Sequence, residues 1–262
     1  MQKEYALVTG GSSGIGKAMC FELAKKKYNL IVVGRNEKNL NELQQKLQTE
    51  FGVEVIILKK DLADAAQTQQ VVDYVLQNKI PLSILINNAG YGLWGTFEEL
   101  SMDEQNKMLQ VNIHAVLSLT HQLLPILKAQ KQAYILNVSS TTAFQPMPYL
   151  NSYGASKAFI DSFTKALQIE LKKHAPNVSV TCLLPGGTDT GFIDRGGFND
   201  KIRKMADKVN MTPKDVANIA LKAMFNKKYE IIPGAINWWS AKAVGFMPAS
   251  LINKITTEIY EK

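Results

Sequence analysis

Tyr153 and Lys157 carry the clearest chemistry in this sequence, because they lie four residues apart and on a helix would share one face. A tyrosine phenol has an ordinary pKa of about 10, which is too high for efficient proton transfer at neutral pH. A neighbouring ammonium group favours the phenolate and lowers that pKa. The pair can therefore give a proton to a carbonyl oxygen or take one from an alcohol. Taken alone, a helical Tyr-x3-Lys is most often ordinary helix surface.

A glycine-rich loop follows the first strand-like run, and its glycines are Gly10, Gly14 and Gly16. Glycine permits a tight turn and a close approach of the backbone to a pyrophosphate, and a following helix offers free N–H groups at its positive end. The spacing G-x3-G-x-G differs from the better known G-x-G-x-x-G, and a glycine loop alone is weak evidence. Its place between a strand and a helix strengthens the prediction of a dinucleotide site.

The second strand-like run ends at Gly34-Arg35, where an NAD-selective site usually carries an acidic residue for the ribose 2′-hydroxyl. Gly34 has no carboxylate, and the planar guanidinium of Arg35 suits a 2′-phosphate. We therefore predict NADP(H) rather than NAD(H) as the cofactor. The alternative is that Arg35 is a surface residue at the end of a strand.

These groups need a framework, and apolar runs of strand length alternate with segments of helical period along the whole chain. The alternation predicts a single α/β domain over residues 1–262, a doubly wound Rossmann fold with about seven parallel strands and helices on both faces. The strands are expected at 5–9, 30–33, 53–58, 84–87, 134–139, 178–184 and 230–233. The helices are expected at 15–27, 37–50, 67–77, 102–128, 153–172 and 250–260.

Composition narrows the class of protein further. The chain has 262 residues, 46% of them hydrophobic, which is typical of a globular domain that needs no disulfides. Cys20 and Cys182 fit a reducing compartment. No apolar run is long enough to cross a bilayer and no signal-peptide pattern precedes the first strand, so we expect a cytoplasmic protein without an integral membrane segment. The three histidines lack metal-ligand spacing, and no metal site is expected.

Several further motifs appear in order between residues 5 and 190, and with them the chain resembles the short-chain dehydrogenase/reductase family. Besides the glycine loop and the Tyr-x3-Lys pair, the motifs are Asp61-Leu62, Asn87–Gly90, Asn112, Ser139-Ser140, Pro185-Gly186 and Thr188 with Thr190. The resemblance implies a catalytic set of Asn112, Ser140, Tyr153 and Lys157. Ser140 is assigned because the family serine stands about thirteen residues before the tyrosine, with Ser139 as the alternative.

The same resemblance implies a role for each catalytic residue. Tyr153 acts as the general acid or base, and the Ser140 hydroxyl steadies negative charge on the substrate oxygen. Asn112 anchors a water that links Lys157 to solvent, although a polar residue at a kink in a long helix is the plain alternative. The nicotinamide itself carries the hydride.

The resemblance also implies the cofactor contacts. Lys157 reaches the nicotinamide ribose, and Thr188 stands where valine is common in the family, which leaves its side-chain role open. The full set of expected cofactor residues is Gly10, Ser12, Ser13, Gly14, Ile15, Gly16, Arg35, Asp61, Leu62, Asn88, Ala89, Gly90, Tyr153, Lys157, Pro185, Gly186, Thr188 and Thr190.

The substrate side is expected to be apolar, which suits a carbonyl or alcohol on a bulky or acyl-chain skeleton. The candidate wall residues are Tyr91, Trp94, Phe144, Tyr149 and Phe192, which otherwise simply pack the loops. Residues 186–200 have the length and glycines of a lid, and the extension 234–262, with Trp238 and Trp239, covers the pocket, the sheet, a membrane surface or a second subunit. The resemblance extends to the NADP(H) branch with 3-ketoacyl reductases, hydroxysteroid dehydrogenases and 3-hydroxy acid dehydrogenases.

The sequence thus predicts an NADP(H)-dependent carbonyl reductase or alcohol dehydrogenase. A non-catalytic dinucleotide sensor or scaffold is the alternative from another class. The net charge of +7 alone suggests a membrane-surface or nucleic-acid binder, but the lysines are scattered and no base-reading stripe is found, so no nucleic-acid partner is expected. Relatives pair through the helices at 102–128 and after Tyr153, which implies a homodimer or homotetramer.

Overall fold

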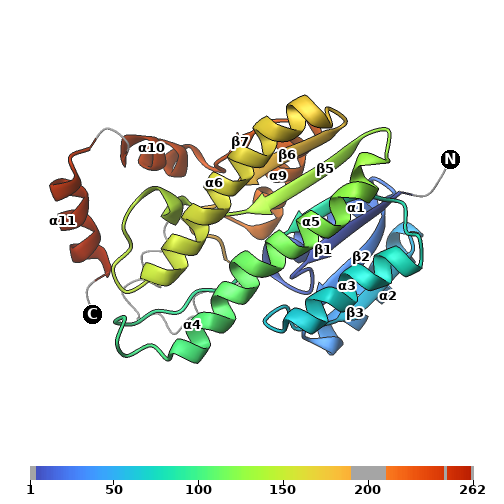
Figure 1. The fold of residues 1–262 in the computed structure, drawn as a ribbon, viewed down its shortest axis with the longest axis horizontal. Coiled ribbons are helices and arrows are strands. Elements are labelled where there is room, and N and C mark those ends of the chain that lie inside the picture. The colour runs from blue at the N-terminus through green and yellow to red at the C-terminus, as the bar shows by residue number, and fades with distance from the viewer. Residues whose placement is uncertain (1–3, 190–210, 245–246, 261–262) are drawn as a thin grey trace.

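The computed structural model describes residues 4–189, 211–244 and 247–260. In these ranges seven parallel strands form one sheet in the order β3-β2-β1-β4-β5-β6-β7 (Figure 1). The strands are β1 Tyr5–Thr9, β2 Asn29–Gly34, β3 Val55–Lys59, β4 Leu82–Asn87, β5 Ala133–Val138, β6 Val178–Leu183 and β7 Glu230–Ile231. The order reverses between β1 and β4, which is where a doubly wound sheet opens a crevice for a ligand. The predicted fold class is confirmed.

Helices cover both faces of the sheet. They are α1 Gly14–Lys25, α2 Glu37–Phe51, α3 Ala65–Gln77, α4 Met102–Leu109, α5 Ala115–Lys128, α6 Asn151–His174, α9 Pro213–Phe225, α10 Ala235–Val244 and α11 Ala249–Tyr260. A π-helical turn, η1 Gln110–His114, and a short 3-10 helix, η2 Thr141–Phe144, are the other helical elements in the described ranges. Local caps explain several starts: Thr212 caps α9 by accepting a hydrogen bond from the Asp215 amide, with proline at the first helical position.

The core lies in two layers, one on each face of the sheet. Leu7 and Ile31 point into the layer under α3, α5 and α6, while Val8 and Val32 point into the layer under α1, α2 and α9. Successive strand residues face opposite sides, so a strand covered on both sides must be apolar throughout. This double burial is the reason for the continuous apolar runs in the sequence.

The expected single helix over 102–128 is wrong in one respect. The π-helical turn η1 separates α4 from α5, and Asn112 lies at its centre. Such a turn inserts one extra residue and is frequent at functional sites. The chain stays helical through it, so the expected range 102–128 spans α4, η1 and α5. Pro125 lies inside α5 without ending it, since the helix continues to Lys128.

The C-terminal segment forms α10 and α11 at the end of the molecule farthest from the N-terminus (Figure 1). Strand β7 is shorter than expected, at two residues. Trp239 is 68% exposed and Ile236 is 70% exposed, so part of α10 faces outward. Among the residues that the structure describes, no helix combines the length and the apolar composition needed to cross a membrane.

Candidate active site

Helix α6 brings Tyr153 and Lys157 together inside the protein. Both side chains are buried, and the Lys157 Nζ lies 5.7 Å from the centre of the Tyr153 ring. The same ammonium group donates a hydrogen bond of 2.9 Å to the main-chain oxygen of Val138, at the end of β5. A Cβ atom at Gly90 would stand 3.2 Å from the Lys157 Nζ, so the lack of a side chain at this position leaves room for the lysine to reach Val138. The predicted pair therefore shares one face, as expected.

Burial changes the acidity of this lysine. Removal from water disfavours the charged form and lowers the pKa of Lys157 to about 8, with a small opposing effect from Cys182. A lysine with that pKa holds its proton at neutral pH and gives it up far more readily than an exposed lysine. The group is thus suited to supplying charge or a proton beside Tyr153.

Asn112 uses its side chain to hold the loop after β4 against α6. Its Nδ2 donates to the main-chain oxygen of Tyr91 at 3.0 Å and to the Ser156 Oγ at 3.1 Å, and its Oδ1 accepts from the Tyr91 amide at 3.1 Å. Ser156 in turn donates to the main-chain oxygen of Tyr153. The Asn112 side chain is thus a link between this loop and α6. Sequence reasoning missed Ser156, although it lies inside the Tyr-x3-Lys motif.

The two neighbouring serines have different partners. The Ser139 hydroxyl donates to the main-chain oxygen of Lys157 at 2.7 Å, which ties β5 to α6. The Ser140 Oγ accepts from the Thr142 amide at 3.2 Å and caps η2, and its own O–H has no acceptor among the described residues. The geometry therefore leaves Ser140 the better placed of the two to donate to a substrate oxygen.

The glycine loop forms a tight backbone cradle ahead of α1. Gly10 has φ +64° and Gly14 has φ +54°, which are backbone conformations that residues with a side chain rarely adopt. A Cβ atom at Gly10 or Gly16 would stand 2.9 or 2.5 Å from the Asn88 Nδ2. Ser13 makes no side-chain cap to α1, so the first N–H groups of the helix stay open to a ligand. These features fit the pyrophosphate of a dinucleotide.

Asn88 and Thr9 fasten this cradle to the end of β4. The Asn88 Nδ2 donates to the main-chain oxygens of Thr9 and Gly10, and the Thr9 Oγ1 accepts from the amides of Asn88 and Ala89. The expected residues 88–90 therefore lie directly beside the glycine loop. The amide groups of Asn88 and Ala89 hold the loop after β4 against the loop after β1. The sequence alone did not predict this role.

Arg35 and Asp61 lie at the outer edge of the same crevice. The Arg35 Nη1 is 3.7 Å from the Asp61 Oδ2, and both side chains are exposed to solvent. A Cβ atom at Gly34 would stand 3.0 Å from the Ser12 Oγ, so the end of β2 packs directly on the glycine loop. Leu62 is buried and belongs to the core. Arg35 therefore follows a strand end that packs on Ser12, and its exposed guanidinium pairs with Asp61.

The loop after β6 forms the other side of the crevice. Thr188 donates from its Oγ1 to the main-chain oxygen of Gly186 at 3.1 Å and pairs with Met211 in an isolated bridge. A Cβ atom at Gly186 would collide with the side chain of Asn237 from α10, a contact that no sequence signal announced. Thr190, Phe192 and most of the expected lid, from residue 190 to 200, lie outside the described residues.

The expected aromatic wall divides into two groups. Tyr91 and Trp94 pack with Met147 and Tyr153 in one apolar cluster, and Trp94 lies 6.1 Å from Tyr149 between ring centres. Phe144 instead packs beside Cys182, Leu184 and Ala241. The first group stands next to the phenol of the candidate acid. The second lies between α6 and α10.

The comparisons with known proteins agree with this arrangement. Residues 4–196 match the family model described as short chain dehydrogenase. A 7beta-hydroxysteroid dehydrogenase from Mediterraneibacter gnavus is 27% identical over 238 residues, which are 89% of this chain and 87% of that protein.

Two solved structures are similar over most of their length. A short-chain dehydrogenase from Sphingobium yanoikuyae, in complex with NADPH, is 27% identical with a TM-score of 0.81 and 93% of each chain covered. A short-chain dehydrogenase/reductase from Burkholderia phymatum, in complex with NAD, is 24% identical with a TM-score of 0.83 and 92% of each chain covered. The likeness to the second shows the fold alone. By its family match, its sheet and its motifs, the chain belongs to the short-chain dehydrogenase family of oxidoreductases.

Proposed function

We propose that the protein is an NADP(H)-dependent oxidoreductase that interconverts a carbonyl compound and a secondary alcohol. The observation that carries the proposal is the buried Lys157, whose ammonium group lies 5.7 Å from the Tyr153 ring at the carboxyl edge of the sheet. The glycine cradle ahead of α1 opens at the same edge. A proton donor beside a dinucleotide site is the arrangement that carbonyl reduction needs.

The chain's own residues supply the acid–base chemistry. Tyr153 donates its phenolic proton to the carbonyl oxygen during reduction. The O–H of Ser140, which has no acceptor in the described part of the chain, donates a hydrogen bond that stabilises negative charge on that oxygen. Lys157, with its pKa lowered to about 8 by burial, returns a proton toward the phenol. Asn112 is a positioning residue, since its side chain fixes the loop after β4 against α6.

The cofactor would be held by the residues around the crevice. When bound, NADP(H) supplies or accepts the hydride. The open N–H groups at the start of α1 would hold the pyrophosphate, and Arg35 would meet the 2′-phosphate beside Ser12. Residues 88–90 and 185–186 would line the remaining edge. Asp61 would pair with Arg35 in the free protein, and the phosphate would compete for that guanidinium.

Fluorescence titration with NADPH and NADH in parallel tests the cofactor. We expect NADPH to bind more tightly and Arg35→Asp to weaken NADPH binding by about 10- to 100-fold, because a charge-assisted pair to the phosphate is lost. Lys25→Asp, the same change of charge at the far end of α1, serves as the control and should leave both affinities unchanged. Equal weakening by both variants, or preference for NADH, would contradict the assignment of Arg35.

The substrate is proposed to be apolar around its carbonyl group. The cluster of Tyr91, Trp94 and Met147 beside Tyr153 supports this, because apolar walls select apolar substrates. A panel that pairs cyclic and acyl-chain ketones with polyhydroxylated ketones of similar size tests it, with NADPH consumption as the readout. We expect the apolar ketones to have the higher kcat/KM. Tight NADPH binding without turnover of any ketone would favour the sensor or scaffold alternative.

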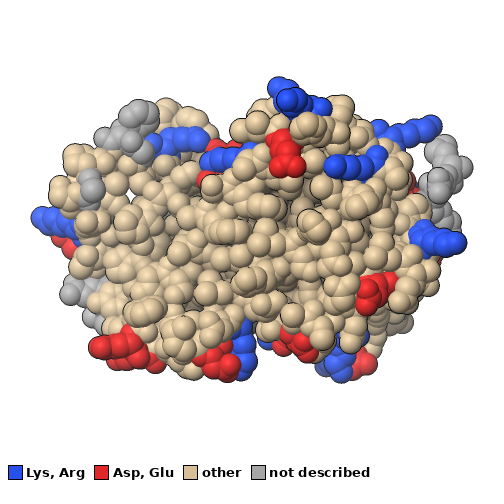
Figure 2. All heavy atoms as spheres, viewed as in Figure 1, with Lys and Arg blue, Asp and Glu red and all other residues tan. Residues whose placement is uncertain are grey.

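We also propose that the protein forms a homodimer or homotetramer through α5 and α6, in the cytoplasm. Figure 2 shows few charged side chains in the middle of the face over these helices, and α6 exposes Ile169 (75%) and Phe159 (40%). Contiguous exposed apolar patches are typical of interfaces, and we propose that these side chains belong to one. Light scattering of the purified protein should give a multiple of the 29.1 kDa chain, and Ile169→Glu with Phe159→Glu should reduce it to the monomer. A monomeric wild-type protein would contradict this.

A further inference from the structure

We propose that helix α10 forms a fixed wall of the substrate side, and that Glu230 latches it to α6 and to the loop after Ser140. We name Asp161, Lys165, Glu230 and Lys242 the Glu230 latch. Its members are positioning residues that affect substrate binding rather than the proton-transfer step. The part of the proposal that concerns substrate rests on the proposed function, whereas the part that concerns the docking of α10 does not.

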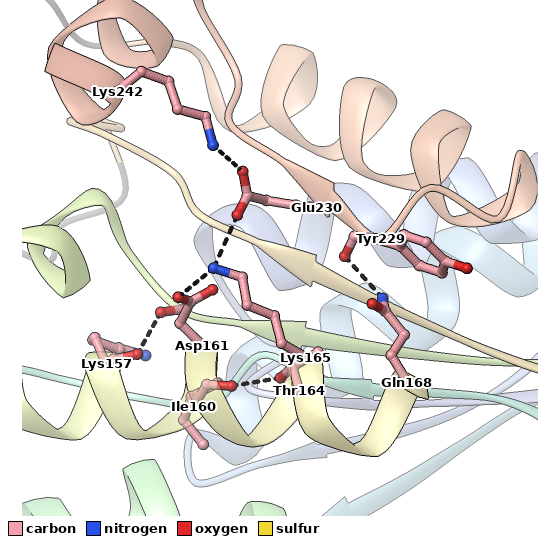
Figure 3. A network of polar contacts seen from close by, with 10 residues as sticks. Lys157, Ile160, Asp161, Thr164, Lys165, Gln168, Tyr229, Glu230 and Lys242 are labelled. Atoms are coloured by element: carbon pink, nitrogen blue, oxygen red, sulfur yellow. Dashed lines mark hydrogen bonds and ion pairs between the residues drawn. The ribbon is translucent and has the colours of Figure 1, made fainter. Parts of the chain in front are cut away.

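The latch is a continuous chain of charges across three elements (Figure 3). The Lys242 Nζ of α10 lies 2.8 Å from one carboxylate oxygen of Glu230, and the Lys165 Nζ of α6 lies 3.2 Å from the other. Lys165 also pairs with Asp161 at 2.7 Å. Glu230 lies in β7, between the two helices. Although burial alone raises the pKa of Glu230, hydrogen bonds from Lys242 and Lys165 outweigh it and hold the pKa below its ordinary value.

Phe144 connects the latch to the loop that carries Ser140. The Lys165 and Lys242 ammonium groups lie 5.7 and 5.9 Å from the centre of its ring, within range of cation–π attraction. Phe144 is the last residue of η2, which begins directly after Ser140. It packs with the buried Ala241 of α10. The charges that hold α10 therefore also hold the end of η2.

Asn237 provides a second contact from the first turn of α10. Its side chain fills the space over Gly186, in the loop after β6, and its Nδ2 donates to the main-chain oxygen of Pro233 at 2.9 Å. Gly234, at φ +86°, permits the turn into the helix. One helix thus touches both loops that flank the crevice, the loop after β5 through Phe144 and the loop after β6 through Asn237.

This geometry predicts which step the latch affects. The Lys157 ammonium group is held by Val138 at the end of β5, and Ser156, which Asn112 contacts, donates to the main chain of Tyr153. Both residues therefore keep their places when α10 loosens. The two flanking loops lose their support. Because the lysines of the latch are more than one-third exposed, the effect of breaking one pair is small, about two- to fivefold in an equilibrium.

Hydrogen exchange of the full chain tests the docking without any substrate. We expect Glu230→Gln to raise the exchange of the α10 amides by about two- to fivefold relative to wild type. Glu22→Gln is the matched control, because the Glu22–Lys25 pair has similar exposure and lies in α1. It should leave α10 unchanged. Equal exchange of α10 in Glu230→Gln and wild type would overturn the latch.

Steady-state kinetics with a ketone that turns over test the role in substrate binding. We expect Glu230→Gln and Lys242→Met to raise KM by about two- to fivefold with kcat within about twofold and NADPH affinity unchanged. Lys242→Arg keeps the pair and should restore the wild-type KM. Raising the salt from about 0.05 to 0.5 M should raise the wild-type KM and leave that of Glu230→Gln unchanged.

The outcomes separate this proposal from the proposed function. Faster exchange of α10 with an unchanged KM would overturn the role in substrate binding and keep the docking. If no ketone turns over, the role in KM falls together with the proposed function, and the exchange experiment alone decides the docking. A fall in kcat with KM unchanged would contradict the assignment of the latch as positioning residues.

Discussion

Two of the four lysines of helix α6, Lys157 and Lys165, lie about two turns apart in opposite environments. Lys157 is 5% exposed, donates to a main-chain oxygen, and has its pKa lowered to about 8 by burial. Lys165 is half-exposed and contacts the carboxylates of Asp161 and Glu230. Partial burial would lower the pKa of Lys165, but hydrogen bonds and charge from both carboxylates raise it above the ordinary value. The first lysine contacts the end of β5, and the second contacts Glu230 of β7 and the ring of Phe144.

The difference shows how surroundings divide one residue type into two roles. A lysine that is buried without a carboxylate neighbour exchanges its proton easily, which suits proton transfer beside Tyr153. A lysine held by two carboxylates keeps its charge and serves as a link between elements. Similar responses of these two regions of α6 to substitution would contradict this division of roles.

The largest expected effect belongs to Tyr153→Phe. Removing the phenolic proton should lower kcat by about 10²- to 10⁴-fold while NADPH still binds, as expected for loss of a general acid. Tyr229→Phe removes the hydroxyl from an exposed tyrosine near the latch and should leave kcat unchanged. The measurement is NADPH consumption with one ketone. Full turnover by Tyr153→Phe would show that Tyr153 is not the general acid.

Lys157→Met should follow, with kcat lower by about 10²- to 10³-fold. Lys165→Met should change kcat by less than about twofold, because its ammonium acts on the docking of α10. Lys157→Arg should not restore activity, since Gly90 and Asn112 leave little room around the Nζ. Similar losses of kcat in the Lys157→Met and Lys165→Met variants would contradict the assignment of different roles to the two lysines.

The two serines sharpen the comparison at the end of β5. Ser140→Ala should lower kcat by about 10²-fold, as for loss of one donor to a developing oxyanion. Ser139→Ala should leave kcat within about threefold and lower the free energy of unfolding by about 1 kcal/mol, because the Lys157 main-chain oxygen loses its buried donor. Kinetics and urea unfolding of both variants provide the check. A reversed pattern would assign the role to Ser139.

The smallest effect concerns pH and stability. The pKa of Lys157 is about 8 in the folded protein and about 10.4 in the unfolded chain. At a pH between these two values, Lys157 is therefore mostly protonated in the unfolded chain and mostly neutral in the folded protein. The free energy of unfolding of wild type, relative to Lys157→Met, should therefore rise with pH from about 8 to 10, by up to about 1 kcal/mol per unit. Relative to Lys165→Met it should fall above about pH 10, because the pKa of Lys165 is raised on folding. Parallel pH dependences would contradict the comparison.

Much of this organisation was predictable from the sequence. Continuous apolar runs predicted the buried parallel strands, and local motifs predicted that Tyr153 and Lys157 share a face and that the glycine loop precedes α1. These features depend on neighbours in the sequence. The π-helical turn at Asn112 was not predicted, and the hydrogen bonds of Asn112 join it to Tyr91, a residue 21 positions away that local sequence patterns do not reveal.

Contacts between distant segments account for the other differences. Phe144 joined the α10 side rather than the wall beside Tyr153 because Ala241 and two lysines pack on it. Asn237 covers Gly186 from about fifty residues away in sequence. The choice of Ser140 over Ser139 as donor was implied by the family spacing, and the hydrogen bond from Ser139 to α6 now gives it a physical reason.

The most direct test of the central claim is transfer of a label to product. The protein is incubated with an apolar ketone and NADPH that carries deuterium at its reactive carbon, and the alcohol is analysed by mass spectrometry. We expect an alcohol with one deuterium on its carbinol carbon, formed by wild type and formed about 10²- to 10⁴-fold more slowly by Tyr153→Phe. Tight NADPH binding with no deuterated alcohol from any ketone of the panel would contradict it.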